Sequence, residues 1–305
     1  MSGAPVVGLV LLVALVAACS GGGSNAGGAT ARTPLPGPAV QEHTIDVGGQ
    51  SRNYRLYAPL SLDRAHPTAL VLIMGGVGNT PDGMVQATGF DQTAQTDNIV
   101  LAYPVGINNT WNAGYCCLVG APSGPDDVTF LGRVIDDVES REPIDRSRVY
   151  AVGVSAGAMM AYRLGCELAP RIAGVGSVAG AMILDDCHPS QPVSVVEIHG
   201  TVDPEVPYQG GATSGGATQP SPPTVAVVQR WAQLDGCPST PPATQVQSPV
   251  TTTTWSGCRG GSAVKLIVVD GGTHTWFASG FGPVSGAVDA TTEIWKFLSA
   301  HRLGA

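Results

Sequence analysis

Short apolar runs alternate with amphipathic segments over most of this chain, and their spacing predicts its secondary structure. Apolar runs typical of buried strands occupy residues 69–74, 99–103, 149–154, 172–178, 193–198 and 264–269. Apolar positions at helical spacing occupy residues 126–140, 156–168, 225–234 and 292–301. Residues 43–47 and 54–58 alternate around two glycines, which predicts an antiparallel hairpin at a sheet edge. Strands that alternate with helices predict a mostly parallel central sheet with helices on both faces.

The N-terminus has the pattern of an export signal. Residues 6–18 are almost wholly apolar, too short a run for a comfortable membrane span, and they end in small residues before Cys19. We therefore predict a signal peptide over residues 1–18. The cysteine resembles the lipobox of bacterial lipoproteins, which implies that Cys19 is lipidated and is the only attachment to a membrane. No Lys or Arg precedes the apolar run, and an ordinary signal peptide with an incidental cysteine is the alternative.

The composition changes after the predicted signal. Residues 19–40 are rich in Gly, Ser and Pro without apolar periodicity, and they predict a flexible tether. We expect one folded domain over residues 41–305, and 43% hydrophobic residues are enough to fill its core. With only 12% charged residues and a net charge of −8, the chain is not suited to nucleic acid or an anionic membrane surface as its main partner.

The cysteines predict disulfide bonds, because the domain is expected to be exported. Cys237 and Cys258 flank a polar, Thr- and Pro-rich segment over residues 239–254 and form the most natural pair. No pair has the spacing of zinc ligands and no histidines cluster near them, so we expect no metal and no cofactor. The sequence leaves open how the remaining cysteines pair: Cys116, Cys117, Cys166 and Cys187.

Residues 149–160 combine a strand, a Gly-x-Ser-x-Gly turn and a helix, in that order. Ser155 stands at the apex, between Gly153 and Gly157, where larger side chains would collide with the neighbouring strand and helix. Such a turn lifts a serine hydroxyl out of the sheet for nucleophilic attack. The motif alone is weak in a chain with 41 glycines, but its place between strand and helix favours a nucleophile over an ordinary turn.

A nucleophilic serine needs a general base, which in this chain order follows it. His274 suits the base, because it follows the strand at 264–269 through a glycine loop, and chemistry gathers at the carboxyl ends of parallel strands. The other histidines after the serine are less suitable: His188, His199 and His301.

The base in turn needs a carboxylate that fixes its tautomer. Asp203 is the best candidate, because it follows the strand at 193–198; its competing role is an Asx-turn before Pro204. Glu205 is the second candidate, and Asp270 ends its own strand too early.

An oxyanion needs two preorganised N–H donors. One should come from the residue after the nucleophile, Ala156, and one from the glycine loop after the strand at 69–74. In that loop we predict Gly76, with Val77 as the alternative.

Six ordered stretches together resemble one family: secreted esterases of the α/β-hydrolase fold that include poly(3-hydroxybutyrate) depolymerases and feruloyl esterases. The resemblance covers nearly the whole domain and is greatest to actinobacterial lipoprotein members. The matching stretches are residues 54–59, 111–117 (Trp-Asn-Ala-Gly-Tyr-Cys-Cys), 126–131, 153–164, 199–208 and 271–276.

The resemblance implies an α/β-hydrolase fold and cleavage of carboxylic esters through an acyl-enzyme. It implies a triad of Ser155, Asp203 and His274, without metal or cofactor. The partner would be a small or polymeric ester, either an oligoester of the polyhydroxybutyrate type or a feruloyl ester of plant polysaccharide. The enzyme would act outside the cell or attached to the envelope.

The resemblance also implies roles for two kinds of residue near the cleft. Trp111 and Trp276 would line it, with ordinary core packing as the alternative. Cys116 and Cys117 would be structural, each bonded elsewhere in the domain.

The chain departs from the family at two positions. Met74 replaces the common histidine before the oxyanion loop, and Thr273 replaces a common glycine before His274. No separate polymer-binding domain is expected. The competing hypothesis is a non-catalytic envelope lipoprotein that uses the fold to bind a ligand or partner; Met74 is the one feature that favours it.

Overall fold

The computed structural model describes residues 1, 40–117, 124–214, 217–239, 242–280 and 282–304. Cys19 lies outside this part of the chain. So do the predicted signal peptide, except Met1, and the predicted tether, except Val40. Among the described residues, no helix combines the length and the apolar character needed to cross a membrane.

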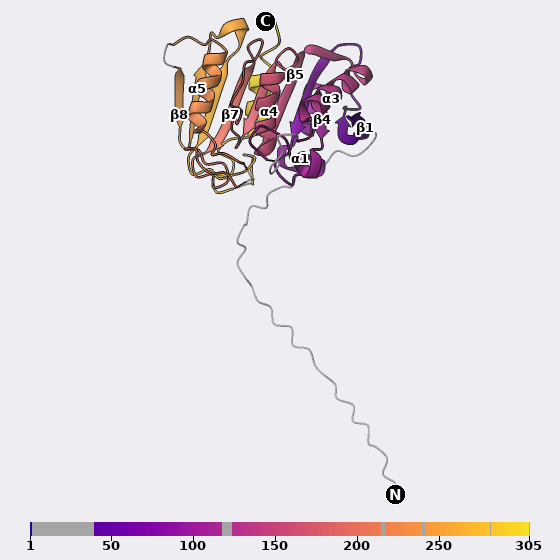
Figure 1. The fold of residues 1–305 in the computed structure, drawn as a ribbon, viewed down its shortest axis with the longest axis horizontal. Coiled ribbons are helices and arrows are strands. Elements are labelled where there is room, and N and C mark those ends of the chain that lie inside the picture. Colours follow the sequence, from indigo (N-terminus) through magenta and orange to yellow (C-terminus); the bar gives the residue numbers. More distant parts are fainter. Residues whose placement is uncertain (2–39, 118–123, 215–216, 240–241, 281, 305) are drawn as a thin grey trace, which may run out of the picture.

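Ten strands of the described chain form one sheet (Figure 1), in the order β1-β2-β4-β3-β5-β6-β7-β10-β9-β8. The strands from β4 to β10 in this order run parallel, and antiparallel hairpins form both edges. The strands are β1 (Val40–Val47), β2 (Gln50–Tyr57), β3 (Thr68–Met74), β4 (Val100–Pro104), β5 (Ile144–Val154), β6 (Gly174–Val178), β7 (Ser194–Gly200), β8 (Ala243–Gln247), β9 (Val250–Trp255) and β10 (Val264–Val269).

Helices cover both faces of the sheet, and each face has its own apolar core. Successive side chains of a strand point to opposite faces, so β3 contributes Leu70 and Leu72 to one core and Val71 and Ile73 to the other. Helices α3 (Asp127–Arg141), α4 (Ala156–Glu167) and α5 (Thr224–Leu234) pack on the first face. Helices α1 (Pro81–Thr88), α2 (Phe90–Asp97) and α6 (Ala290–Leu298) pack on the second. This arrangement confirms the predicted fold class.

Four elements were not predicted from the sequence: α1, α2, β8 and β9. The two helices are short and carry few apolar residues, and Gly89, in a left-handed conformation with φ 63°, separates them. The β8–β9 hairpin occupies much of the polar segment predicted only as a disulfide-closed loop. Every residue of β8 is exposed, so the hairpin lacks the apolar alternation by which strands are recognised.

The disulfides of the described chain include the predicted pair, Cys237–Cys258. Cys166 pairs with Cys187 across the first core. The expectation that Cys116 and Cys117 each bond elsewhere is wrong: they bond to each other, across a cis peptide, with their Cα atoms 3.1 Å apart. Once the other four cysteines are paired, no other described cysteine is left for either of them.

Candidate active site

The residues predicted as nucleophile, acid and base follow three strands of the parallel part of the sheet. Ser155 directly follows β5, whose Gly153 pairs with Met74 at the end of β3. Asp203 follows β7 and His274 follows β10, two neighbouring strands that end level with each other. The carboxyl ends of these strands therefore bring all three residues to one edge of the sheet.

Ser155 occupies a strained turn, with φ 55° and ψ −123°. Its N–H donates to the carbonyl oxygen of Val178 at 2.9 Å. A Cβ at Gly153 would lie 2.3 Å from the carbonyl carbon of Gly157, and a Cβ at Gly157 would lie 2.1 Å from the carbonyl oxygen of Met74. Backbone therefore packs against backbone on both sides of the serine, at a distance that only glycine permits.

Asp203 and His274 are in direct contact: Nδ1 of the imidazole lies 2.8 Å from Oδ2 of the carboxylate. A carboxylate can only accept, so Nδ1 carries the proton and Nε2 of the neutral ring keeps its lone pair. The two loops are packed together, because Val202 donates its N–H to the carbonyl oxygen of Gly272 at 3.0 Å. A Cβ at Gly200 would lie 2.2 Å from that oxygen.

Asp203 uses its two oxygens differently. Oδ1 accepts the N–H groups of Glu205 and Val206 at 2.8 and 2.9 Å, which is the Asx-turn considered as its competing role. Oδ2 faces His274. Burial opposes ionisation, but hydrogen bonds from His199 and His274 hold the pKa of Asp203 well below its usual range. The same residue therefore closes its loop and presents a permanently charged oxygen to the imidazole.

The second acid candidate lies on the other side of the ring. Oε2 of Glu205 is 3.7 Å from Nε2 of His274, and the Glu205 side chain is 54% exposed. Oδ1 of Asp270, in contrast, accepts the hydroxyl of Thr201 at 3.0 Å and makes no ion pair with the imidazole among the described residues. Asp203 alone combines burial with a hydrogen bond to Nδ1.

The other histidines after Ser155 have different surroundings. His188 is exposed beside Asp186 at 2.7 Å, and Nδ1 of His301 faces the carbonyl oxygen of Phe297 at 2.8 Å. His199 is fully buried behind Asp203.

The glycine loop between β3 and α1 is closed by a side chain that the sequence analysis did not single out. Asn79 accepts the N–H of Gly76 on Oδ1 at 2.8 Å and donates its own N–H to the Gly76 carbonyl at 3.1 Å. The N–H of Gly76, the predicted oxyanion donor, is therefore engaged by Asn79 in this structure. No described residue accepts the N–H of Val77, the alternative. An asparagine after glycines is a frequent turn residue, and that was the available signal.

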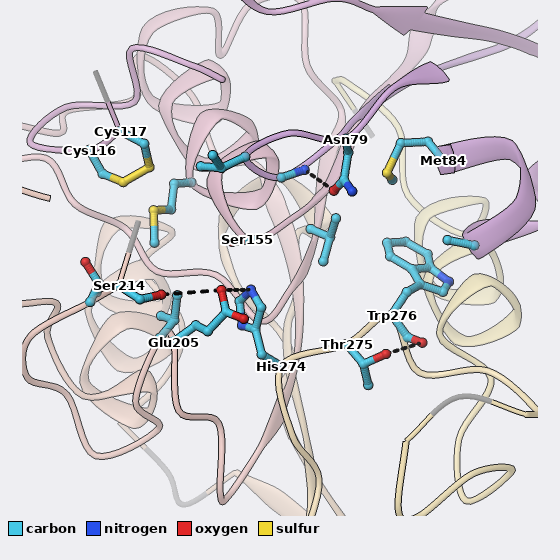
Figure 2. A pocket seen from close by; sticks show the side chains of 17 residues that line it. Asn79, Met84, Cys116, Cys117, Ser155, Glu205, Ser214, His274, Thr275 and Trp276 are labelled. Carbon is cyan, nitrogen blue, oxygen red and sulfur yellow. Dashed lines mark hydrogen bonds and ion pairs between the residues drawn. A yellow bond between two sulfur atoms is a disulfide. The ribbon is translucent and has the colours of Figure 1, made fainter. Parts of the chain in front are cut away.

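A cavity of about 450 Å³ opens at this edge of the sheet (Figure 2). Both Ser155 and His274 line it. Figure 2 shows the Cys116–Cys117 disulfide, Ser214 and Glu205 toward one side, and Met84 and Trp276 toward the other. The remaining lining residues are Gly76, Val77, Asn79, Ala87, Val154, Met159, Val206, Thr213 and Thr275.

The two tryptophans predicted to line the cleft differ in position. Trp276 lines the cavity, and its indole N–H donates to Oγ1 of Thr291 at 3.1 Å, which fixes the ring. Trp111 does not line the cavity; it is 2% exposed and donates its indole N–H to the carbonyl oxygen of Gly75 at 2.9 Å. The prediction for Trp111 is therefore wrong, because its ring packs behind the glycine loop. The Cys116–Cys117 disulfide contributes to the cavity wall instead.

Among the described residues, no cluster of three or more His, Cys, Asp or Glu side chains is arranged to hold a metal ion. The groups available for chemistry at this site are a hydroxyl, an imidazole, carboxylates and backbone N–H donors. Such a set is suited to acyl transfer.

Comparisons with known proteins agree with this geometry. Residues 127–221 match the family described as Phospholipase/Carboxylesterase. The acetyl xylan esterase of Aspergillus awamori has a similar structure, with a TM-score of 0.60 at 15% identity over 85% of this chain and 99% of that one. The ferulic acid esterase of Anaeromyces mucronatus has a TM-score of 0.52 at 14% identity over 90% of this chain and 95% of that one. The protein is an esterase, a carboxylic ester hydrolase, of the α/β-hydrolase fold.

Relatives found by sequence place the chain in a narrower group of esterases. The esterase NocK of Nocardia uniformis subsp. tsuyamanensis is 30% identical over 279 residues, which are 85% of this chain and 80% of NocK. Feruloyl esterase C of Aspergillus clavatus is 30% identical over 273 residues, 86% of this chain and 88% of that one. The chain belongs to the esterase family of these proteins.

Proposed function

We propose that this esterase cleaves its substrates by nucleophilic catalysis, with Ser155, His274 and Asp203 as its triad. The observation that carries the proposal is the 2.8 Å contact of Asp203 with Nδ1 of His274, at a cavity that Ser155 shares with this histidine. Because Nδ1 donates to Asp203, Nε2 is the nitrogen that can take a proton from the serine.

The reaction would then proceed in two halves. Oγ of Ser155 attacks the ester carbonyl while Nε2 of His274 takes the hydroxyl proton, and a tetrahedral oxyanion forms. The imidazolium gives this proton to the departing alcohol, which leaves an acyl-serine. Water, deprotonated by the same nitrogen, releases the acid and restores the serine. Each half needs one base and one acid, and the same imidazole serves as both.

The oxyanion would be stabilised by two backbone N–H groups. Ala156 supplies the first, because it begins α4 and its N–H has no acceptor within the helix. Val77 supplies the second, in place of Gly76, whose N–H Asn79 occupies. Ala156 directly follows the nucleophile, and Val77 lines the same cavity as Ser155.

We further propose esters of an aromatic acid as the substrate class. Relatives named as feruloyl esterases match this chain over 86–95% of its length and 88–96% of their own. The cavity has room for a phenolic acid, and sulfur-bearing and aromatic side chains line it: Met84, Cys116, Cys117, Met159 and Trp276. Sulfur atoms make favourable contacts with aromatic rings. Glu205 lies beside Nε2 of the base and accepts the hydroxyl of Ser214, on the side where a hydroxylated alcohol would leave.

An exported location is part of the proposal. Three disulfides in the described chain are typical of proteins that fold in an oxidising compartment. Attachment through a lipid on Cys19 would keep the enzyme at the cell envelope. Metabolic labelling with a fatty-acid analogue, compared between the natural chain and Cys19→Ser, tests this attachment.

The test of the catalytic proposal is a substrate panel on the full chain beside Ser155→Ala. Methyl ferulate, 3-hydroxybutyrate oligomers and p-nitrophenyl acetate distinguish an aromatic-acid esterase, a polyester depolymerase and a general esterase. Ser155→Ala should lose at least about 10⁴-fold in kcat, since triad members act as a unit. Hydrolysis that survives in Ser155→Ala would reject the nucleophile. If none of the three esters is hydrolysed and a fluorophosphonate does not label Ser155, the result would favour a non-catalytic binding protein.

A further inference from the structure

His199 lies directly behind the candidate triad and has no role in the reaction described above. It sits near the end of β7, and its side chain is fully buried. Nδ1 lies 2.9 Å from Oε1 of Glu197, and Nε2 lies 2.8 Å from the carbonyl oxygen of Val206. Nε2 is also 3.4 Å from Oδ2 of Asp203, the oxygen that accepts from His274.

These contacts determine the protonation of the ring. A carbonyl oxygen and an ionised carboxylate can only accept hydrogen bonds, so beside the carbonyl of Val206 and an ionised Glu197 both ring nitrogens donate. His199 is therefore an imidazolium. Burial opposes the charge, but hydrogen bonds to Asp203 and Glu197 outweigh it and raise the pKa of His199 to about 10.

The imidazolium separates two buried carboxylates. Glu197 is fully buried and Asp203 is 5% exposed, and neither could stay ionised at low cost without a cation nearby. Oε2 of Glu197 accepts the hydroxyl of Tyr162 at 3.1 Å, and Oε1, which faces His199, also accepts the N–H of Gly180 at 3.4 Å. Glu197 is thus held in place by hydrogen bonds, and Asp203 is the carboxylate of the cluster that contacts His274.

Several further groups face this cluster. The hydroxyl of Thr224, on α5, lies 3.4 Å from Nδ1 of His199, and the Tyr208 ring lies 6.0 Å from the imidazole. Burial beside Glu197 raises the pKa of Tyr162, on α4, well above its usual value, so its hydroxyl stays neutral. His274, after β10, meets the cluster only through Asp203. The imidazolium is thus the cation that contacts both carboxylates.

We propose that His199 is a positioning residue for the esterase reaction: its imidazolium holds Oδ2 of Asp203 in the orientation that His274 requires. Backbone N–H groups fix only Oδ1 of Asp203, so Oδ2 needs a second anchor to stay in line with Nδ1 of His274. This inference rests on the proposed triad. It assigns His199 no contact with the substrate.

The first experiment compares His199→Gln with the double variant Glu197→Gln/His199→Gln in the full chain, on p-nitrophenyl acetate. His199→Gln removes the cation, so kcat should fall about 10- to 100-fold with KM unchanged, by the loss of a charge-assisted hydrogen bond. The acidic limb of the pH–rate profile should move to higher pH, because Asp203 and the protonated His274 lose a neighbouring cation.

The double variant separates positioning from structural support. It removes the buried charge of Glu197 that His199→Gln leaves without a cation, so its melting temperature should recover part of the way toward that of the natural protein. Its kcat should stay low. Recovery of kcat together with the melting temperature would overturn the proposal, because His199 would then serve folding alone. In an Asp203→Asn background, His199→Gln should lower kcat by less than about 3-fold, since both substitutions act through Oδ2 of Asp203. A further loss of about 10- to 100-fold in that background would also contradict the proposal.

A second measurement does not depend on activity. The ring ¹⁵N resonances of the six histidines distinguish imidazolium from neutral rings, and His199→Gln assigns the relevant pair. His199 should stay doubly protonated at pH 8, in Ser155→Ala as in the natural protein. A neutral tautomer at pH 8 would reject the imidazolium even if the esterase triad is correct. Conversely, hydrolysis that persists in Ser155→Ala would reject the triad and leave the imidazolium standing.

Discussion

Trp111 donates its indole N–H to the carbonyl oxygen of Gly75 at 2.9 Å, and this bond ties the loop after β4 to the glycine loop after β3. Met74, the last residue of β3, directly precedes that glycine loop. Met74 has no hydrogen-bonding group suited to hold the loop, and it is fully buried. Trp111 therefore supports from behind the loop that carries Val77, the proposed oxyanion donor.

Trp111→Phe should weaken catalysis more than binding. The ring is kept, but the buried Gly75 carbonyl loses its donor, at a cost of about 1–3 kcal/mol. We expect kcat to fall about 10-fold with KM nearly unchanged, and the melting temperature to fall by a few degrees. Trp255→Phe, on β9 of the β8–β9 hairpin, is the matched control and should leave kcat intact. A change in KM alone would contradict the supporting role.

Gly157→Ala should abolish activity and reduce soluble protein. A Cβ there would lie 2.1 Å from the carbonyl oxygen of Met74, which forces β3 and α4 apart. Gly83→Ala, in α1, is the control: its Cβ would lie 3.5 Å from Oγ1 of Thr80, an ordinary contact. Because alanine favours a helix over glycine, this control should gain about 0.5–1 kcal/mol in unfolding free energy. Wild-type activity in Gly157→Ala would show that the turn can relax.

The vicinal disulfide should matter for the substrate more than for stability. Cys116→Ala/Cys117→Ala removes two sulfur atoms from the cavity wall. We expect KM for methyl ferulate to rise about 5- to 20-fold, equivalent to about 1–2 kcal/mol of lost contact, while p-nitrophenyl acetate is little affected. Cys237→Ser/Cys258→Ser opens a disulfide at the far edge of the sheet and should lower the melting temperature without changing the ratio of the two substrates. Equal losses on both esters would place the sulfur atoms outside the substrate path.

Asp235 should make stability depend on pH. It is fully buried, and Oδ1 accepts the N–H of Val193 at 3.1 Å. Burial raises its pKa to about 6. Between its unfolded value of about 4 and this folded value, the native state binds more protons than the unfolded state, so stability falls as pH rises. Above about pH 6 this contribution to the unfolding free energy is fully lost.

The measurement is chemical denaturation of the natural protein and Asp235→Asn from pH 4 to pH 8. The difference in unfolding free energy should change by about 1–3 kcal/mol in favour of Asp235→Asn as pH rises to 7. Taking the difference between the two proteins removes the opposite contribution of Asp203, whose lowered pKa stabilises the fold and whose contribution is lost only as the pH falls below about 4. Parallel curves for the two proteins would show that Asp235 does not titrate in this range.

The sequence by itself determined the central architecture and the approximate site. Strands buried on both faces are mostly apolar, so β3, the second half of β5, and most of β7 and β10 were visible as apolar runs. Residues just beyond such strands meet at one edge, which is why Ser155, Asp203 and His274 could be selected from local context. The glycines beside Ser155 were also readable, because a backbone contact excludes every larger side chain wherever it occurs.

Only the tertiary structure decided how groups distant in the chain share partners. Hydrogen bonds and disulfides form between whichever groups the fold brings within a few ångströms, and local pattern carries no record of that distance. In the structure, Cys116 forms a disulfide with Cys117. Trp111 donates a hydrogen bond to the carbonyl of Gly75, and Asn79 accepts the N–H of Gly76. It also placed His199 between Glu197 and Asp203, because two residues on one strand and one on the following loop converge only when that loop folds back.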